Sequence, residues 1–291
     1  VLFRSVELVQ IQFETEKQAA RMMEILIKQH VCEEQLSNII YDDRSKISIS
    51  FTDNNMAPII QLIRDGVLAF IQEELLPQWL AKIVSEKFFY SEQDECHEIV
   101  EMALTMMNEK EAPYKDFWDE LQLKVQDGLV LVFEKRVSFS FPSFLTFRMR
   151  GVMHHLIEFV GDAIDEYKME QEYQSFVHAL RNHMLSNTPK LKQLHVLHQY
   201  YFHFYSDKFS KIERTKLKRY IDRKLQTSFP VYIDESVLAP LISIAPKHLF
   251  IYSDEENHPL ILTIQRIFEE RVKVLPHKMF KTKQLLATIK K

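Results

Sequence analysis

The chain has 291 residues, of which 46% are hydrophobic and 27% are charged, and its formal net charge is −4. This composition is typical of a globular protein and excludes a wholly disordered chain, while the lack of a basic excess argues against a dedicated nucleic-acid-binding protein. The chain has four glycines, and no two lie closer than ten positions, which excludes the Gly-rich phosphate loops of Walker-type and dinucleotide-binding proteins.

The cysteine content and the apolar runs predict a cytoplasmic protein. Cys32 and Cys96 are too few for a disulfide framework and suit a reducing compartment. No apolar run approaches the roughly 20 residues that span a bilayer, and no secretory signal is recognisable at the start. Residues 1–5 (VLFRS) match the translation of a common sequencing adapter. We interpret them as adapter read-through and exclude them from the fold prediction.

The first part of the chain predicts a small α+β unit over residues 6–53. Alternating apolar and polar residues indicate strands, and 3–4 spacing of apolar residues indicates a helix, with Thr15 as its N-cap. The strands are expected at 6–13, 38–41 and 46–51, and the helix at 16–30. The order is therefore βαββ.

A helical region is expected over residues 54–188. The shorter helices are predicted at 54–84, with an interruption at Pro77, at 92–107 and at 114–133. The longest periodic stretch, 143–185, would reach about 65 Å as a straight helix, which exceeds most globular cores. We therefore expect one long helix with a kink or break near Gly161 or near residues 169–172.

Residues 189–275 are expected to form a mixed α/β unit. Strands are predicted at 191–198, 201–206, 231–233, 249–252 and 272–275, and helices at 212–225 and 259–272. The first two strands should form a hairpin. Residues 276–291 are a basic tail, which we expect to fray. The whole pattern predicts an α+β fold.

One row of side chains on the long helix is a candidate catalytic site. His154, Glu158 and Asp162 are spaced by four residues and share one helix face, so they are able to seed an acid–base or divalent-metal site. The pair of Glu-x-x-His motifs that dimetal helical bundles use is absent. Structural-zinc spacing and a Gly-x-Ser-x-Gly elbow are absent as well. We expect no cofactor and no metal, and we keep this enzyme hypothesis as an alternative to surface pairing.

Three histidines crowd one predicted hairpin. His195 and His198 differ by an odd number of positions, so on a strand they face opposite sides of the sheet. His203 would need the hairpin bend to join either of them. The spacing therefore argues against a metal shared by these three residues.

A basic segment with interleaved aromatic residues follows Asp207. It is able to bind phosphate groups of nucleic acid or of a membrane surface, although a solvated helix face explains the same pattern. The candidate anion-binding residues are Lys216, Lys218, Arg219, Arg223 and Lys224. We do not expect nucleic acid as a partner and keep this hypothesis as a second alternative.

Four segments of the second half together resemble the YtxC-like family. They are FLTFRMR at 144–150, GDAIDEYKMEQEY at 161–173 with Phe176, LISIAP at 241–246, and TIQRIFEERV at 263–272. The resemblance runs through most of residues 142–274, and it implies a place among proteins of endospore-forming bacteria that carry a sporulation label. No activity, substrate or catalytic residue comes with the family.

The residues that carry this resemblance are better suited to contacts than to chemistry. Aromatic side chains can form a stripe, and Arg148 lies in the chain before an acidic row of Asp165, Glu166, Glu170 and Glu172 that is able to pair or to dock a partner. We therefore expect a sporulation-associated, non-enzymatic protein that binds an unknown protein partner. The oligomeric state is not predicted.

Overall fold

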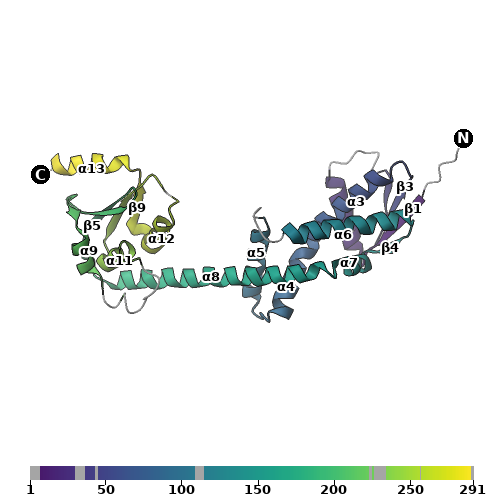
Figure 1. The fold of residues 1–291 in the computed structure, drawn as a ribbon, viewed down its shortest axis with the longest axis horizontal. Coiled ribbons are helices and arrows are strands. Elements are labelled where there is room, and N and C mark those ends of the chain that lie inside the picture. The colour runs from purple at the N-terminus through teal and green to yellow at the C-terminus, as the bar shows by residue number, and fades with distance from the viewer. Residues whose placement is uncertain are drawn as a thin grey trace. The chain divides into compact units, whose positions relative to one another are not determined.

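The computed structural model describes residues 7–29, 37–42, 45–108, 115–222, 225, 234–255 and 257–289. It confirms the predicted α+β fold class (Figure 1). The contacts divide the chain into two compact units, Val1–Lys168 and Met169–Lys291. The division falls within a helix, and not at the expected boundaries 53/54 and 188/189.

The first unit combines a four-stranded sheet with helices. Its elements, in chain order, are β1 (Glu7–Gln12), α1 (Glu16–Lys28), β2 (Ile39–Asp42), β3 (Lys46–Phe51), α3 (Met56–Phe70), the π-helical turn η1 (Ile71–Leu75), α4 (Leu76–Lys87), α5 (Gln93–Asn108), α6 (Lys115–Glu134), β4 (Phe139–Ser140), α7 (Phe141–Met149) and the first part of α8 (Val152–Ser186). The predicted βαββ order is confirmed. The N-cap at Thr15 is confirmed as well, because its hydroxyl accepts a hydrogen bond from the backbone N–H of Gln18.

The sheet has the strand order β2-β3-β1-β4. β3 pairs antiparallel with β1 and with β2, while the short β4 pairs parallel with β1. Ile47, Ile49 and Phe51 on β3 are buried, and the residues between them are partly exposed. This period-two alternation turns one face of the sheet toward the core.

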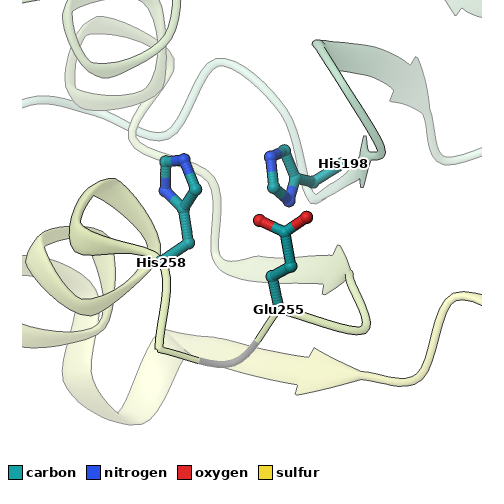
Figure 2. Close-up of side chains that lie close together, drawn as sticks. All are labelled: His198, Glu255 and His258. Atoms are coloured by element: carbon teal, nitrogen blue, oxygen red, sulfur yellow. The ribbon is translucent and has the colours of Figure 1, made fainter.

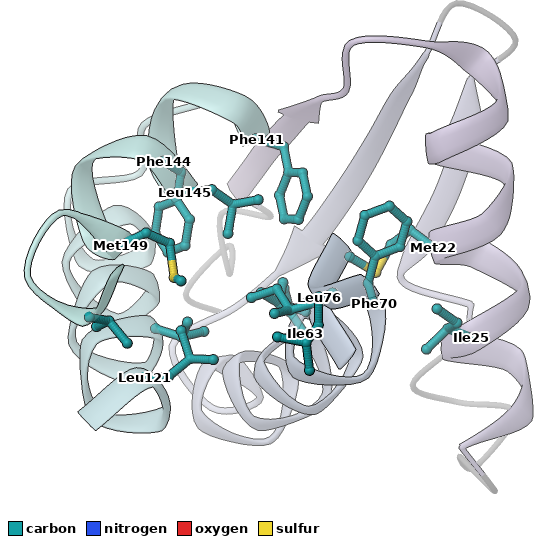
Figure 3. Packing of buried hydrophobic residues seen from close by; sticks show 14 of the residues in the cluster. Met22, Ile25, Ile63, Phe70, Leu76, Leu121, Phe141, Phe144, Leu145 and Met149 are labelled. Atoms are coloured by element: carbon teal, nitrogen blue, oxygen red, sulfur yellow. The ribbon is translucent and has the colours of Figure 1, made fainter. Parts of the chain in front are cut away.

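Aromatic contacts join that face to helices that lie far along the chain. Phe51 packs against Phe133 of α6, with ring centroids 5.1 Å apart. Phe141 at the start of α7 lies 4.8 Å from Phe13 and 5.5 Å from Phe70, and Figure 3 shows it in the packed interior beside Phe70. A sheet covered by one helix would leave much of its apolar face in water, so β1, α1, β2 and β3 share a single core with the helices that follow.

The helix that runs from α3 into α4 widens instead of breaking at Pro77. Proline has no N–H to donate, and the preceding turn is a π-helix in which the N–H of Leu76 donates to the carbonyl of Ile71. The turn presents Glu73 and Glu74 to Arg21 of α1, at N–O distances of 2.9 and 2.7 Å. The hydrogen bond to Glu24 of α1 itself, followed by the one to Glu74, raises the pKa of Arg21. The ion pairs with Glu73 and Glu74 fasten α1 to the widened turn.

The break in the long helical stretch occurs at Arg150 and Gly151, between α7 and α8. The expected position near Gly161 or residues 169–172 is therefore wrong, since α8 continues through both. A Cβ at Gly161 would lie 3.6 Å from the ring of Phe88, an ordinary contact, so nothing there forces the helix to bend. At Gly151 a Cβ would lie 2.5 Å from Nζ of Lys124, and glycine is a weak helix former.

The second unit is built on a mixed five-stranded sheet. Its elements after the end of α8 are β5 (Gln193–His198), β6 (Phe202–Ser206), β7 (Lys211–Ile212), α9 (Arg214–Tyr220), α11 (Leu238–Ile244), β8 (His248–Tyr252), α12 (Pro259–Phe268), the 3₁₀ turn η2 (Glu269–Arg271), β9 (Val272–Leu275) and α13 (Lys278–Ile289). The predicted hairpin of β5 and β6 is confirmed. The strand expected at 231–233 lies outside the described residues.

The strand order of this sheet is β7-β6-β5-β8-β9, with β5, β8 and β9 parallel. Leu194 and Val196 of β5 belong to a core that includes α11, α12 and the end of α8. Leu197 lies in a smaller cluster on the other face, together with Phe280 of α13. Figure 1 shows α13 on one side of these strands and α11 and α12 on the other.

Residues 278–289 of the predicted basic tail do not fray as expected, because they form α13. Phe280 is buried and contacts the rings of Tyr205, Phe209 and Tyr252, at centroid distances of 4.8–5.4 Å. Lys283 lies 4.6 Å from the centre of the Phe250 ring. Burial of one aromatic side chain and a cation–π contact hold this charged helix on the sheet.

His195 is a buried titratable group between α13 and the sheet. Its ring stacks between Phe209 and Phe250, at centroid distances of 4.1 and 5.1 Å, and Nδ1 lies 3.0 Å from the hydroxyl of Tyr252. Burial lowers the pKa of His195 to about 4 and raises the pKa of Tyr252 to about 12. Both side chains are therefore neutral at physiological pH.

Adding one methyl group at two helical glycines should have opposite effects. At Gly128 of α6 a Cβ would lie 2.7 Å from Cε2 of Phe144, a buried ring that packs on Phe139, so Gly128→Ala should lower the free energy of unfolding by about 1–3 kcal/mol. Gly161→Ala meets no clash and should raise it by up to about 1 kcal/mol through helix propensity. Urea unfolding, followed by the fluorescence of Trp79 and Trp118 in the first unit, measures both changes in the free energy of unfolding. If Gly128→Ala were as stable as the original chain, or more stable, the close contact with Phe144 would be contradicted.

Acidification should destabilise the second unit through His195. Below pH 6.5 the unfolded chain takes up a proton that the folded unit accepts only near pH 4, so stability falls as the pH drops through this window. Between pH 7.5 and 4.5 the loss should be roughly 2–3 kcal/mol at 1.36 kcal/mol per pKa unit. His195→Gln should remove this part of the fall in the free energy of unfolding. Urea unfolding at the two pH values, followed by circular dichroism, measures it. His248→Gln, at an exposed histidine of the same unit, should behave as the original chain; if both variants keep the full loss, the assignment to His195 is wrong.

Candidate functional sites

The row on the long helix lies in the first unit on an open part of α8. Nε2 of His154 is 3.3 Å from Oε1 of Glu158, but the two side chains are 73% and 62% exposed, and Asp162 is exposed as well. Nε2 of the neighbouring His155 lies 3.2 Å from Oε2 of Glu120 on α6. The structure thus brings His154 and Glu158 together without the enclosure that excludes water from a catalytic site.

The predicted interaction residues are spread over both units. The guanidinium of Arg148 lies 5.8 Å from the centre of the Phe144 ring and 5.3 Å from that of Phe147, and no ion pair of Arg148 occurs within the described ranges. Asp165 and Glu166 are exposed in the first unit. In the second unit Glu170 is half-buried and Glu172 is exposed. Arg148 therefore contacts aromatic rings instead of the acidic row.

Part of the candidate anion-binding segment forms α9. Lys216, Lys218 and Arg219 are exposed on this helix, which is anchored by the buried Leu217. Arg223 and Lys224 lie outside the described residues. The exposed face fits either solvent or an anionic surface, so the anion-binding role stays a prediction.

A groove in the first unit was not predicted from the sequence. It has a volume of about 510 Å³ and lies between α4, α7 and the first turns of α8. The apolar part of its lining includes Trp79, Phe141, Leu145, Met149, Met153 and Ile157. Figure 3 shows Phe141, Leu145 and Met149 projecting from α7 on the core side of that helix. The break at Gly151 allows both α7 and α8 to contribute to one lining.

Charged side chains surround this apolar groove. Lys82 lies 3.9 Å from Glu86 and forms an ion pair with it. Lys87 and Arg150 are exposed and form no ion pair with any described residue, and Glu14 is the remaining carboxylate of the lining. The groove therefore presents two cations, Lys87 and Arg150, and one carboxylate, Glu14, that form no ion pair with a described residue, beside an apolar surface.

Two histidines and a glutamate converge in the second unit. His198 is the last residue of β5, Glu255 follows the end of β8, and His258 is the N-cap of α12. One ligand atom from each side chain lies within 4.8 Å of the other two, and Figure 2 shows the carboxylate directed toward the two rings. This is the single group of potential metal ligands found among the described residues.

The His198 ring is held by its surroundings. Only 5% of the residue is exposed, the ring stacks on Phe202 at 4.3 Å, and Nδ1 lies 2.9 Å from the hydroxyl oxygen of Ser253. Burial lowers the pKa of His198, the charge of His258 lowers it further, and Glu255 opposes these effects. The neutral imidazole, which is the form that binds a metal ion, is thereby favoured.

Sequence reasoning missed the partners of His198. As predicted, His195 and His198 lie on opposite faces of the sheet, and His203 does not join the cluster. Glu255 and His258 form a single Glu-x-x-His motif in the loop after β8. That motif was the available signal, but only the pairing of β5 with β8 connects it to His198.

The comparisons with known proteins agree with the resemblance noted from the sequence. The profile of the YtxC-like family matches residues 61–273. The chain is 31% identical over 271 residues to the uncharacterized protein YtxC of Bacillus subtilis (strain 168), and the alignment covers 92% of this chain and 94% of that protein. No solved structure matches the chain.

None of the helices in the described ranges has the length and apolar content needed to cross a membrane. The family match covers well over half of the chain, and the similarity to the Bacillus subtilis protein extends over nearly the full length of both. The chain belongs to the YtxC-like family.

Proposed function

We propose that this protein is a sporulation-associated cytoplasmic protein, without catalytic activity of its own, that binds a partner protein in the groove of its first unit. The sporulation part of the proposal is supported by the label that members of the YtxC-like family carry. The binding part is supported by one observation, the apolar groove between α4, α7 and α8.

The chemistry of the groove favours an amphipathic helix of a partner protein. Its walls are helices, and a groove between helices accepts the apolar side of another helix. Met149 and Met153 are flexible and polarizable, which lets the lining adapt to side chains of different shape. Lys87 and Arg150 complement carboxylates flanking the apolar side of the incoming helix.

The two alternative functions have less support. An enzyme that uses His154, Glu158 and Asp162 would work with three exposed side chains that do not exclude water from a reaction. A nucleic-acid or membrane-surface binder would rely on a short helix, α9, of which Lys216, Lys218 and Arg219 are the described basic candidates. None of the described candidate residues of the two alternatives lines the groove.

A photo-crosslinking side chain at position 153 tests the groove directly. Replacing Met153, a half-buried residue of the lining, by p-benzoylphenylalanine should give a covalent adduct with one partner in sporulating cells. The crosslinked peptide of that partner should be an amphipathic helix with acidic flanks. Charge reversal by Lys87→Glu together with Arg150→Glu should reduce the adduct about tenfold, as expected for a loss of 1.4 kcal/mol.

The matched control places the same crosslinker at Leu123, which is 64% exposed on α6 and does not line the groove. An adduct of equal yield from position 123, or an adduct at position 153 that is insensitive to the double charge reversal, would contradict a specific groove. Circular dichroism of each variant shows whether the fold is retained.

Deletion of the gene in its host tests the sporulation role. The number of heat-resistant spores should fall, because loss of a required protein contact interrupts the process, and growth without sporulation should be unaffected. Re-expression of the original chain should restore spore formation, whereas the Lys87→Glu, Arg150→Glu variant should not. Unchanged spore yield in the deletion strain would reject the sporulation role. Binding of a partner in the groove would still be tested independently by the crosslinking experiment.

A further inference from the structure

We propose that His198, Glu255 and His258 bind one divalent metal ion of the zinc class, with two imidazole nitrogens and one carboxylate oxygen as the protein ligands. The proposal rests on the convergence of the three side chains, whose ligand atoms lie within 4.8 Å of one another (Figure 2). It concerns the second unit and is independent of the partner-binding groove.

The position of the cluster in the sheet supports a binding site. β5 and β8 are adjacent parallel strands, and the three residues lie at or just beyond their carboxyl ends. The chain leaves β5 toward β6 on one side and leaves β8 toward α12 and β9 on the other. Ligands of sheets with parallel strands bind at such a switch point, because connections that diverge leave a space between them.

A hydrogen-bond network orients His198 for ligation. The hydroxyl of Ser253, which is 2% exposed, accepts from the N–H of Glu255 at 3.0 Å and donates to the carbonyl of Glu255 at 3.5 Å. The same hydroxyl oxygen lies 2.9 Å from Nδ1 of His198 and can accept from Nδ1 in the tautomer that leaves Nε2 unprotonated. Nε2 then keeps its lone pair. A partner that fixes the tautomer of an imidazole is the usual companion of a histidine ligand.

The ligand set selects the class of metal. Two imidazoles and one carboxylate match zinc, which takes nitrogen and oxygen ligands at about 2.0–2.2 Å and commonly has four of them. Calcium and magnesium prefer oxygen ligands throughout. Closing the ligand atoms around zinc requires small movements, and the exposed Glu255 and half-buried His258 are free to make them. Three protein ligands leave one position for water.

When His258 binds the metal ion, it loses a hydrogen bond that caps α12 and gains a bond to the metal. Its Nδ1 accepts a hydrogen bond from the N–H of Leu260 at 3.2 Å and so caps α12. Ligation through Nε2 moves the ring proton to Nδ1, and the cap bond is lost while a metal bond is gained. The metal thereby ties the loop before α12 to the end of β5.

A competition titration tests the proposal. The full-length chain is first freed of metal, and Zn²⁺ is then added in the presence of a chromophoric chelator, whose absorbance reports how much zinc the protein binds. One tightly bound zinc per chain is expected, together with a rise in the unfolding temperature. His258→Asn should weaken this binding at least 100-fold and abolish the rise, since asparagine keeps an N-cap but removes the imidazole. Glu255→Gln, at an exposed side chain, should weaken it about 10–100-fold.

His248→Asn is the matched control, because His248 is an exposed histidine of the same unit at the opposite end of β8. It should bind zinc as the original chain does. Absence of a stoichiometric zinc at micromolar protein, or variants His258→Asn and Glu255→Gln that bind as tightly as the original chain, would overturn the proposal. A loss in His248→Asn as large as in His258→Asn would overturn it too, because it would show binding by dispersed surface histidines.

Discussion

The contact of Phe141 with Phe13 and Phe70 decides the arrangement of the first unit. Phe141 follows directly after β4, and its ring lies 4.8 Å from Phe13 at the end of β1 and 5.5 Å from Phe70 at the end of α3. One buried ring thus ties the sheet, the helix that follows the sheet and the start of α7 together. Since α7 forms one wall of the groove, this packing also fixes the position of that wall.

In the second unit the equivalent constraint is the parallel pairing of β5 with β8. It brings His198 beside Ser253, 55 positions later in the chain, and it places the loop that carries Glu255 and His258 over the end of β5. The other face of the same strands holds His195 and Tyr252 in a sealed aromatic cluster under α13. One face therefore keeps its histidine neutral and enclosed, while the carboxyl end of the sheet presents three potential ligands together.

The two proposed sites differ in the physical effect on which they depend. The groove relies on apolar surface and unpaired positive charge, which select a class of helix without defining a reaction. The histidine cluster relies on oriented lone pairs, which select a class of ion. Membership of the YtxC-like family supplies no activity for either site, so both proposals stand on the geometry of the residues themselves.

Local sequence determined the elements whose signals lie within a few residues. The N-cap at Thr15, the alternation over residues 46–51 and the hairpin of β5 and β6 are predictable because short-range hydrogen bonding and side-chain periodicity define them. The shared core of the first unit, the anchoring of α13 by Phe280 and the meeting of His198 with Glu255 and His258 were decided by tertiary structure. Each depends on contacts between distant residues, and such contacts leave no local pattern in the chain.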